Sequence, residues 1–132
     1  MAELEKHDWL PFRQVAAQGN ALIMVGHVIL TQVDPQNPAS FSKAVVDGII
    51  RQGWGYQGVV VTDDLTMSAA YNHGLCHVMV SSLNAGVDLL LVSYDYEKYY
   101  QAMYCASRAY EDGQLDRQML DISDKRLAAL VK

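Results

Sequence analysis

Two adjacent carboxylates, Asp63 and Asp64, are the residues of this sequence best suited to do chemistry. They follow Val59-Val60-Val61-Thr62, a β-branched run typical of a buried strand. In parallel α/β folds the loops after the strands build the pocket, so reactive groups gather at the carboxyl ends of the strands. Side chains alternate along a strand, so only one of the two carboxylates can readily face such a pocket. From the residues alone, two alternatives stay open: an Asp that caps the following turn, and an Asp that serves catalysis or ligand binding.

The same rule selects the segments that follow two other apolar runs. Gly26-His27 comes after Ala21-Leu22-Ile23-Met24-Val25, and Ser93-Tyr94-Asp95 comes after Asp88-Leu89-Leu90-Leu91-Val92. A single histidine beside a strand end is either a hydrogen-bonded filler of the structure or a ligand in the pocket. We therefore expect the candidate site to be assembled from these two segments and the carboxylate pair.

A metal site is an alternative interpretation of the same residues. His27, Asp63 and Asp64 could form a histidine–carboxylate set, but ligands on separate loops without local spacing are a weak signal. His73 and His77 are four residues apart, yet nothing acidic accompanies them, which favours a surface role. We expect neither a metal nor another cofactor.

The elements that position these residues follow from hydrophobic periodicity. Apolar runs alternate with helix-period segments along the whole chain, which predicts repeated βα units in an α/β fold of about three parallel strands with flanking helices. The strands are expected at 21–25, 59–62 and 88–92, and the first is expected to be buried on both faces. Helices are expected over residues 11–18, 43–52, 75–83, 97–111 and 116–131. The tyrosine cluster is interpreted as helix packing rather than as a sugar-stacking platform; it comprises Tyr94, Tyr96, Tyr99, Tyr100 and Tyr104.

Composition excludes several classes of protein. The 132 residues fit one domain, and 51% hydrophobic residues are too many for a disordered chain. Ten scattered Lys and Arg are outnumbered by fifteen Asp and Glu, so no nucleic-acid partner is expected. No stretch approaches the ~18 apolar residues of a membrane helix, so no membrane partner is expected either. Cys76 and Cys105 lack CxxC or histidine partners, which predicts reduced thiols in a cytoplasmic protein.

Blocks along the chain resemble family 3 glycoside hydrolases, in particular the cytoplasmic β-N-acetylhexosaminidase branch. The segment Gly55 to Met67, with its Val-Val-Val-Thr-Asp-Asp-Leu-Thr-Met end, is the most specific of these. The others, in order, are Trp9-Leu10-Pro11-Phe12, Met24-Val25-Gly26-His27-Val28, Asp34-Pro35, Pro38-Ala39-Ser40-Phe41-Ser42, Arg51, and Ala85-Gly86-Val87-Asp88-Leu89-Leu90-Leu91.

The resemblance implies a fold, an activity and roles for residues. It implies a partial TIM-type (β/α) barrel, with residues 1–132 as the C-terminal portion of the catalytic domain, because a full barrel needs about 250 residues. It also implies a retaining β-N-acetylglucosaminidase that trims a carbohydrate substrate during peptidoglycan recycling. Asp63 would be the nucleophile, Asp64 and Met67 would shape the pocket, and His27 would line the sugar site.

The same resemblance predicts that this chain is incomplete. The branch carries its acid/base histidine and aspartate on a loop after the fifth strand, and a Lys-His-Phe-Pro-Gly-His-Gly segment helps to bind the sugar. Neither pattern occurs among these residues. The alternative function is therefore a catalytically inactive half-barrel that folds or oligomerises.

Three strands cannot close a barrel, so the sheet should expose an apolar face and two unpaired edges. We expect a homo-oligomer that covers this face, with Asp63 near the interface and projecting into the largest concave surface. The alternative is that the helix at residues 11–18 folds over the open face and keeps the chain monomeric.

Overall fold

The computed structural model, which describes every residue except 1, 20 and 132, contains one parallel sheet of three strands. The strands β1 (Ile23–Val25), β2 (Val60–Asp64) and β3 (Leu89–Leu91) lie in that order, with β2 in the centre. Met24 pairs with Val61, which pairs in turn with Leu89. The predicted α/β class, strand number and parallel direction are confirmed.

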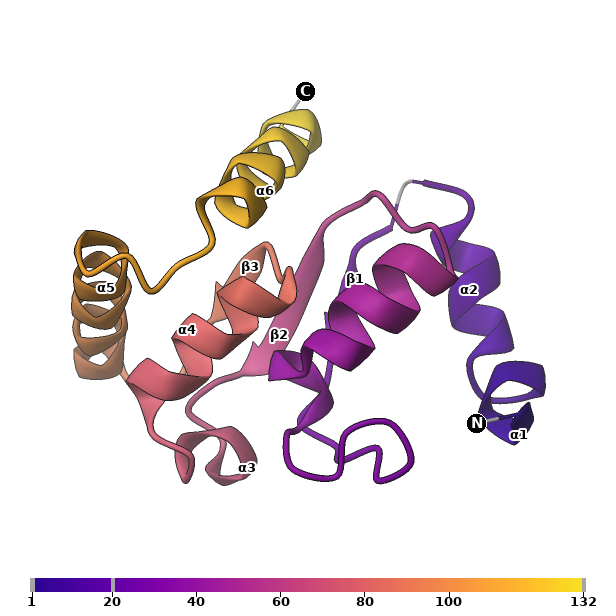
Figure 1. Ribbon diagram of the computed structural model, residues 1–132, viewed down its shortest axis with the longest axis horizontal. Helices are drawn as coiled ribbons and strands as arrows, with labels where there is room; N and C mark the ends of the chain where they lie inside the picture. The colour runs from indigo at the N-terminus through magenta and orange to yellow at the C-terminus, as the bar shows by residue number, and fades with distance from the viewer. Residues whose placement is uncertain (1, 20, 132) are drawn as a thin grey trace.

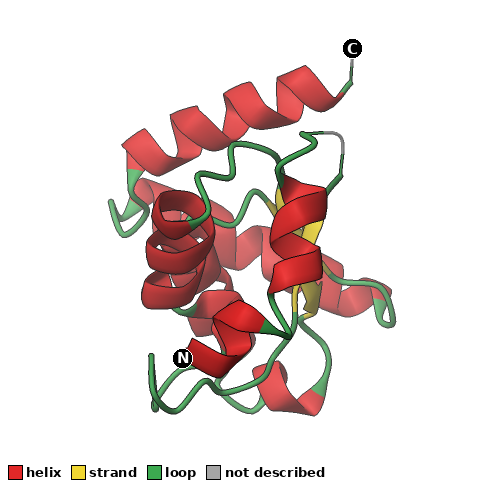
Figure 2. Cartoon of the chain, turned by 90° about the vertical axis from the view of Figure 1, so that its right-hand side faces the viewer, coloured by secondary structure: helices red, strands yellow, loops and turns green. Residues whose placement is uncertain are grey.

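Helices flank the sheet and join its strands. In Figure 1 η2 and α4 lie side by side in front of the strands, with α5 and α2 at opposite ends of the molecule. Figure 2 shows α6 running across the top. The helical elements are α1 (Ala2–Lys6), α2 (Leu10–Ala16), the short 3-10 helix η1 (Ala39–Phe41), the π-helix η2 (Ala44–Gly53), α3 (Ser68–Tyr71), α4 (Leu75–Ala85), α5 (Tyr96–Glu111) and α6 (Arg117–Leu130). No helix within residues 2–19 and 21–131 is long and apolar enough to cross a membrane.

The main core lies between the sheet and the helices η2 and α4. Val60 and Thr62 of the central strand are completely buried on this side. The residues clustered around Val60 include Val25, Val45, Val46, Ile50, Ala85 and Val87. Gly86 ends α4 with a φ of 97°, a left-handed conformation that glycine adopts without a Cβ clash. This turn returns the chain directly to β3.

A second core joins α4 to α5 and corrects the prediction for the cysteines. Phe41, Leu65, Leu75 and Val78 belong to this cluster. Cys76 of α4 and Cys105 of α5 form a disulfide with their Cα atoms 5.0 Å apart, so the prediction of reduced thiols is wrong. The absence of a CxxC motif was a poor guide, because helix packing brings together cysteines 29 positions apart in the chain.

The other face of the sheet is open. Met24 is 57% exposed and Leu89 is also exposed, and the register places both beside Val61. The prediction that the first strand is buried on both faces is therefore wrong, because no second layer covers this side. The helix α2 lies beside β1, where Phe12 and Val15 line a hollow together with Met24, but it leaves the Met24 side chain exposed.

A buried ionic cluster fastens η2, the sheet and α6 together. Asp88, just before β3, accepts hydrogen bonds from Arg51 at 2.5 Å and Arg126 at 3.2 Å, and from the backbone N–H of Val60 at 2.8 Å. Arg51 also donates to the carbonyl oxygens of Tyr56, Gly58 and Gly86. Desolvation lowers the pKa of Arg51, against the opposing effect of the Asp88 carboxylate. The cluster holds the amino ends of β2 and β3 in register.

Candidate active site

The three predicted segments meet at the carboxyl edge of the sheet. His27 follows β1, Asp63 and Asp64 end β2, and Ser93 follows β3. The Nε2 atom of His27 lies 2.9 Å from the backbone oxygen of Asp64, and the Ser93 hydroxyl donates to the Asp64 carboxylate. Parallel strands bring their carboxyl ends to one edge, which is why positions up to 66 residues apart converge here.

Asp64 organises the turn that leaves the central strand. Its Oδ1 accepts hydrogen bonds from the backbone N–H and the hydroxyl of Thr66, both at 2.8 Å. Burial of the carboxyl works to raise the pKa of Asp64, but the hydrogen bonds from Ser93 and Thr66 outweigh it, so its pKa is lowered. The turn-capping alternative therefore describes this second carboxylate.

Asp63 has fewer partners than its neighbour. The one hydrogen bond described for its carboxylate comes from the backbone N–H of Asp64, 2.8 Å from Oδ1. Asp63 is half-buried, as is Val61 two positions before it, whereas Val60 and Thr62 are buried on the helix side. Strand alternation therefore associates Asp63 with the open face of the sheet.

A bulge separates the two carboxylates further. Between the pairs Val61–Leu89 and Asp64–Leu91, the central strand has one more residue than its partner. Inside this irregularity the backbone N–H of Leu91 donates to the Thr62 hydroxyl at 3.0 Å. Bulges re-aim side chains next to functional sites, and this one lets Asp64 reach Ser93.

His27 is held from both sides. Its Nδ1 atom lies 2.6 Å from the hydroxyl of the buried Ser40, while Nε2 faces the Asp64 carbonyl oxygen. Because Nε2 must donate to that carbonyl, Nδ1 accepts the Ser40 hydrogen in the neutral imidazole. His27 thus connects the loop after β1, the η1 segment and the end of β2.

Met67, which was expected to shape the pocket, follows the turn that Asp64 stabilises. Its backbone N–H donates to the Asp64 carbonyl at 3.0 Å, and its own carbonyl accepts from Ala70 and Tyr71 at the start of α3. The Met67 side chain is exposed. It therefore belongs to the rim of the site, where the turn passes into α3.

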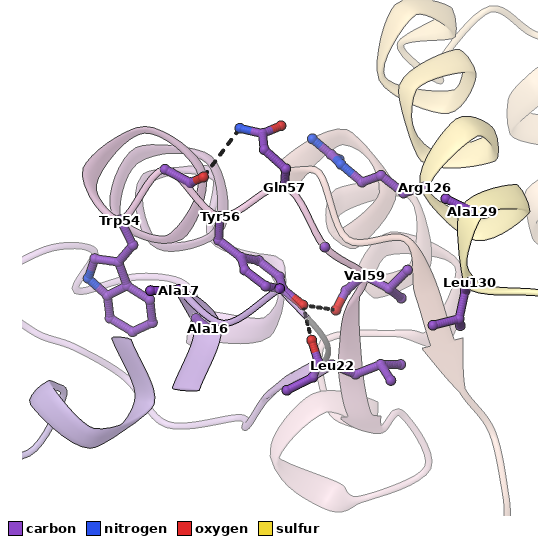
Figure 3. A pocket seen from close by; sticks show the side chains of 14 residues that line it. Ala16, Ala17, Leu22, Trp54, Tyr56, Gln57, Val59, Arg126, Ala129 and Leu130 are labelled. Atoms are coloured by element: carbon purple, nitrogen blue, oxygen red, sulfur yellow. Dashed lines mark hydrogen bonds between the residues drawn. The ribbon is translucent and has the colours of Figure 1, made fainter. Parts of the chain in front are cut away.

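The prediction that Asp63 projects into the largest concave surface is wrong. The largest cavity described, about 570 Å³, lies at the opposite end of the strands and is lined by the α2–β1 connection, residues 54–59 and α6. Figure 3 shows the Tyr56 hydroxyl between the backbone oxygens of Ala21 and Val59 at this end, with Arg126 at the rim. Asp63 does not line this cavity, because it lies at the carboxyl ends of the strands.

The histidines give no support to a metal centre. Within residues 2–19 and 21–131, no group of three or more His, Cys, Asp or Glu side chains is arranged to hold a metal ion. Both ring nitrogens of His27 are already engaged. His73 precedes α4 while His77 lies on it, and the rings of both contact Phe41 edge-on.

Two serine hydroxyls complete the site, and no sequence pattern predicts the contacts that these hydroxyls make. Ser40 and Ser93 contact the predicted residues directly. Ser93 lay within a predicted segment, but serine is common after strands, and only the strand register shows that its hydroxyl reaches Asp64. Ser40 lies 13 positions after His27 in the chain, and only the fold brings its hydroxyl to the His27 ring.

Comparisons with known proteins agree on one family. The model of the family described as "Glycosyl hydrolase family 3 N terminal domain" matches residues 1–130. The chain is 39% identical over 94 residues to a protein named "Beta-hexosaminidase" from Nitrosomonas eutropha, covering 70% of this chain and 27% of that protein. A protein of the same name from Tolumonas auensis is 41% identical over 91 residues, covering 67% and 27%.

Solved structures agree with these sequences. A glycoside hydrolase family 3 β-N-acetylglucosaminidase from Paenibacillus superimposes with a TM-score of 0.93 and 37% identity, covering 98% of this chain and 25% of that one. The β-N-acetylglucosaminidase from Thermotoga maritima gives 0.91 and 26%, covering 98% and 29%. The chain thus spans about a quarter of the length of these relatives.

Proposed function

Because the chain belongs to glycosyl hydrolase family 3, we propose that its carboxyl-edge site serves the hydrolysis of β-N-acetylglucosaminides by a retaining mechanism. The observation that carries the proposal is the convergence of His27, Asp63, Asp64 and Ser93 at the edge where α/β folds build their sites. The β-hexosaminidase and β-N-acetylglucosaminidase relatives supply the substrate class.

Asp63 is the nucleophile of this proposal. One carboxylate oxygen attacks the anomeric carbon, and the bond to the leaving oxygen breaks with its electron pair going to the leaving group. Water then releases the sugar from the covalent ester, with overall retention of configuration. The Asp64 N–H donates to Oδ1 of Asp63 and orients the carboxylate, while Oδ2 has no protein partner described and is the oxygen available for attack.

The neighbouring residues have supporting roles. Asp64 is committed to Ser93 and Thr66, so it shapes the turn. His27 fixes the Asp64 carbonyl, and Met67 lies where the leaving group or its attached chain would pass the rim. The proton donor for the leaving group lies outside this set, since none of these side chains is free to provide it.

The source of the substrate and the cellular compartment are part of the same proposal. Peptidoglycan-derived N-acetylglucosaminides in the cytoplasm are the proposed substrates. The Cys76–Cys105 disulfide argues against the cytoplasmic part of this proposal, because disulfides persist mainly in oxidising compartments. Trapping of thiols before cell lysis tests the compartment: alkylated cysteines support a cytoplasmic location, and an unmodified disulfide contradicts it.

The proposed partner is a second copy of the chain. The uncovered sheet face, with Met24 and Leu89 exposed beside Val61, is an apolar surface of the kind that self-association covers. A copy seated there would place its own residues close to Asp63.

A chromogenic β-N-acetylglucosaminide assay tests the activity. Turnover that is lost in Asp63→Asn and retained in part in Asp64→Asn supports the nucleophile assignment. Equal turnover in wild type and Asp63→Asn contradicts it. Absence of turnover in every variant favours the inactive half-barrel.

A further inference from the structure

The tyrosines that were expected to pack inside the helix layer lie on the surface instead. Tyr96, Tyr100 and Tyr104 are 76%, 69% and 66% exposed, and Tyr94 and Tyr99 are exposed as well. The buried face of α5 is made by Ala102, Cys105 and Ala109. The interpretation as helix packing is therefore wrong, because small residues fill the contact with α4 and leave the large rings outside.

We propose that these rings form a binding platform for a neutral glycan chain, an inference that rests on the proposed glycosidase function and names where its substrate extends. The tyrosine platform is defined as Tyr94, Tyr96, Tyr99, Tyr100 and Tyr104. Tyr96, Tyr100 and Tyr104 are four residues apart, so they form one stripe along the helix. The stripe extends about 12 Å along the axis, at about 1.5 Å per residue.

The platform begins at the candidate active site. Ser93, whose hydroxyl contacts the Asp64 carboxylate, is followed at once by Tyr94 and then by Asp95, which caps α5 through the N–H of Glu97. The chain therefore passes from the carboxyl edge through Tyr94 directly into the first turn of α5, where the stripe begins. A chain whose terminal sugar sits at Asp63 can continue over Tyr94 and Tyr96.

The chemistry of the stripe favours sugars over protein. Helix α5 contains no Leu, Ile, Val, Phe or Trp, the residues that usually anchor a helix in an apolar groove, and Met103 is its one large aliphatic side chain exposed beside the rings. Tyrosine presents a flat apolar face together with a hydroxyl at its edge. This combination suits a sugar ring, which has an apolar C–H face and a polar rim.

The balanced charges of α5 favour a neutral ligand. The two acidic residues of α5, Glu97 and Glu111, balance its two basic residues, Lys98 and Arg108. Lys98 is directed to Tyr71, with Nζ 2.5 Å from the phenol oxygen and 4.8 Å from the ring centre. The chain as a whole carries a net charge of −5, which disfavours nucleic acid and anionic membranes.

The test is binding by the intact chain, measured by calorimetry and by NMR of the tyrosine rings. The probes are N-acetylglucosamine, its β-1,4-linked dimer and longer neutral oligomers. We expect affinity to rise with oligomer length as more rings are covered. Tyr100→Ala and Tyr104→Ala should each weaken the binding of long oligomers about twofold to tenfold, whereas Tyr100→Phe should retain it.

Tyr110→Ala is the matched control. Tyr110 is an exposed tyrosine of the same helix, but it stacks against Arg117 and lies off the stripe. Oligomer affinity that is unchanged by Tyr100→Ala and Tyr104→Ala, or absent in the wild type, overturns the platform. Loss of self-association in the same two variants also overturns it, because the stripe would then be a protein interface.

The outcome is separable from that of the proposed hydrolysis. Length-dependent binding without turnover leaves the platform in place and contradicts only the activity. Asp63-dependent turnover without stripe-dependent binding leaves the activity in place and contradicts only the platform.

Discussion

Asp63 and Asp64 are neighbours in the chain, yet their carboxylates have different surroundings. Asp64 accepts from Thr66 and Ser93 and is occupied by the turn, whereas Asp63 accepts one described hydrogen bond and lies toward the open face. Adjacent acids with such different environments usually have different tasks. Asp64 is thus the structural carboxylate of the pair, and we propose that Asp63 is the reactive one.

His27 provides the first quantitative test at this scale. We expect His27→Ala to lower the free energy of unfolding by about 1–3 kcal/mol, because it removes the ring that joins Ser40 to the Asp64 carbonyl. Urea denaturation measures the change. His7→Ala is the control: His7 is exposed at the end of α1 and its replacement should cost less than about 0.5 kcal/mol. Equal effects of the two substitutions would show that His27 does not hold the site together.

The loop before η1 is built on one acidic residue. Asp34 accepts hydrogen bonds from the buried Ser42 hydroxyl at 2.7 Å and from both backbone and side chain of Asn37. The Ser42 hydrogen bond is the largest influence on the pKa of Asp34, which is lowered although desolvation opposes the shift. The ionised carboxylate therefore stabilises the folded loop.

A lowered folded-state pKa fixes the sign of the pH dependence. The stabilisation from Asp34 is present above the pKa of the unfolded chain, near 4, and is lost as pH falls through the lower pKa of the folded state. We expect the free energy of unfolding to decline with acid in this range, and the decline to be smaller in Asp34→Asn. Urea melts at a series of pH values from neutral to acid measure it. A steeper acid decline in the variant would contradict the assignment.

Asp88 is the central residue of the cluster that joins three elements. Removing it leaves the guanidinium groups of Arg51 and Arg126 without their carboxylate in a buried environment. We expect Asp88→Ala to lower the free energy of unfolding by about 3–5 kcal/mol. Arg108→Ala removes two exposed ion pairs, to Glu111 and Asp112, and should cost less than about 1 kcal/mol in the same denaturation experiment. A loss below 1 kcal/mol for Asp88→Ala would show that the cluster contributes little.

Helices and strands could be predicted from the sequence where the residue pattern that marks them is local. β-branched and apolar runs located all three strands, and hydrophobic periodicity located the five longer helices to within a few positions. The short elements η1 and α3 were missed, because they depend on neighbouring turns rather than on periodicity. The disulfide and the contacts of Ser40 arise from long-range packing, which has no local signal.

The tyrosines show a different limit of sequence analysis. An aromatic residue on a helix is usually buried, so helix packing was the natural interpretation. The small residues Ala102 and Ala109 form the contact with α4 instead. Only the spatial arrangement reveals that the aromatic stripe points away from the core.

At the scale of the whole molecule, we expect the uncovered sheet face to determine the assembly. We expect a dimer in solution, about twice the 14.7 kDa of one chain, since a contact of about 800 Å² per partner is typical of stable association. Met24→Glu places a charge on the open face and should give monomers. Val131→Glu, at the exposed end of α6, should leave the dimer intact. Light scattering of wild type and both variants decides: a monodisperse 14.7 kDa wild-type species would contradict the proposal.

We expect the fold as a whole to supply a nucleophile and its support at one edge, which makes covalent trapping the most direct test of the account. An aryl β-N-acetylglucosaminide with a strongly acidic phenol needs no proton donor for its departure, so the reaction can proceed without the acid/base residues. Mass spectrometry of the incubated protein should then detect one added sugar, and fragmentation should locate it on Asp63. The Asp63→Asn variant should remain unmodified. A sugar located on Asp64 or on another residue, or no covalent adduct at all, would contradict the assignment of Asp63 as the nucleophile.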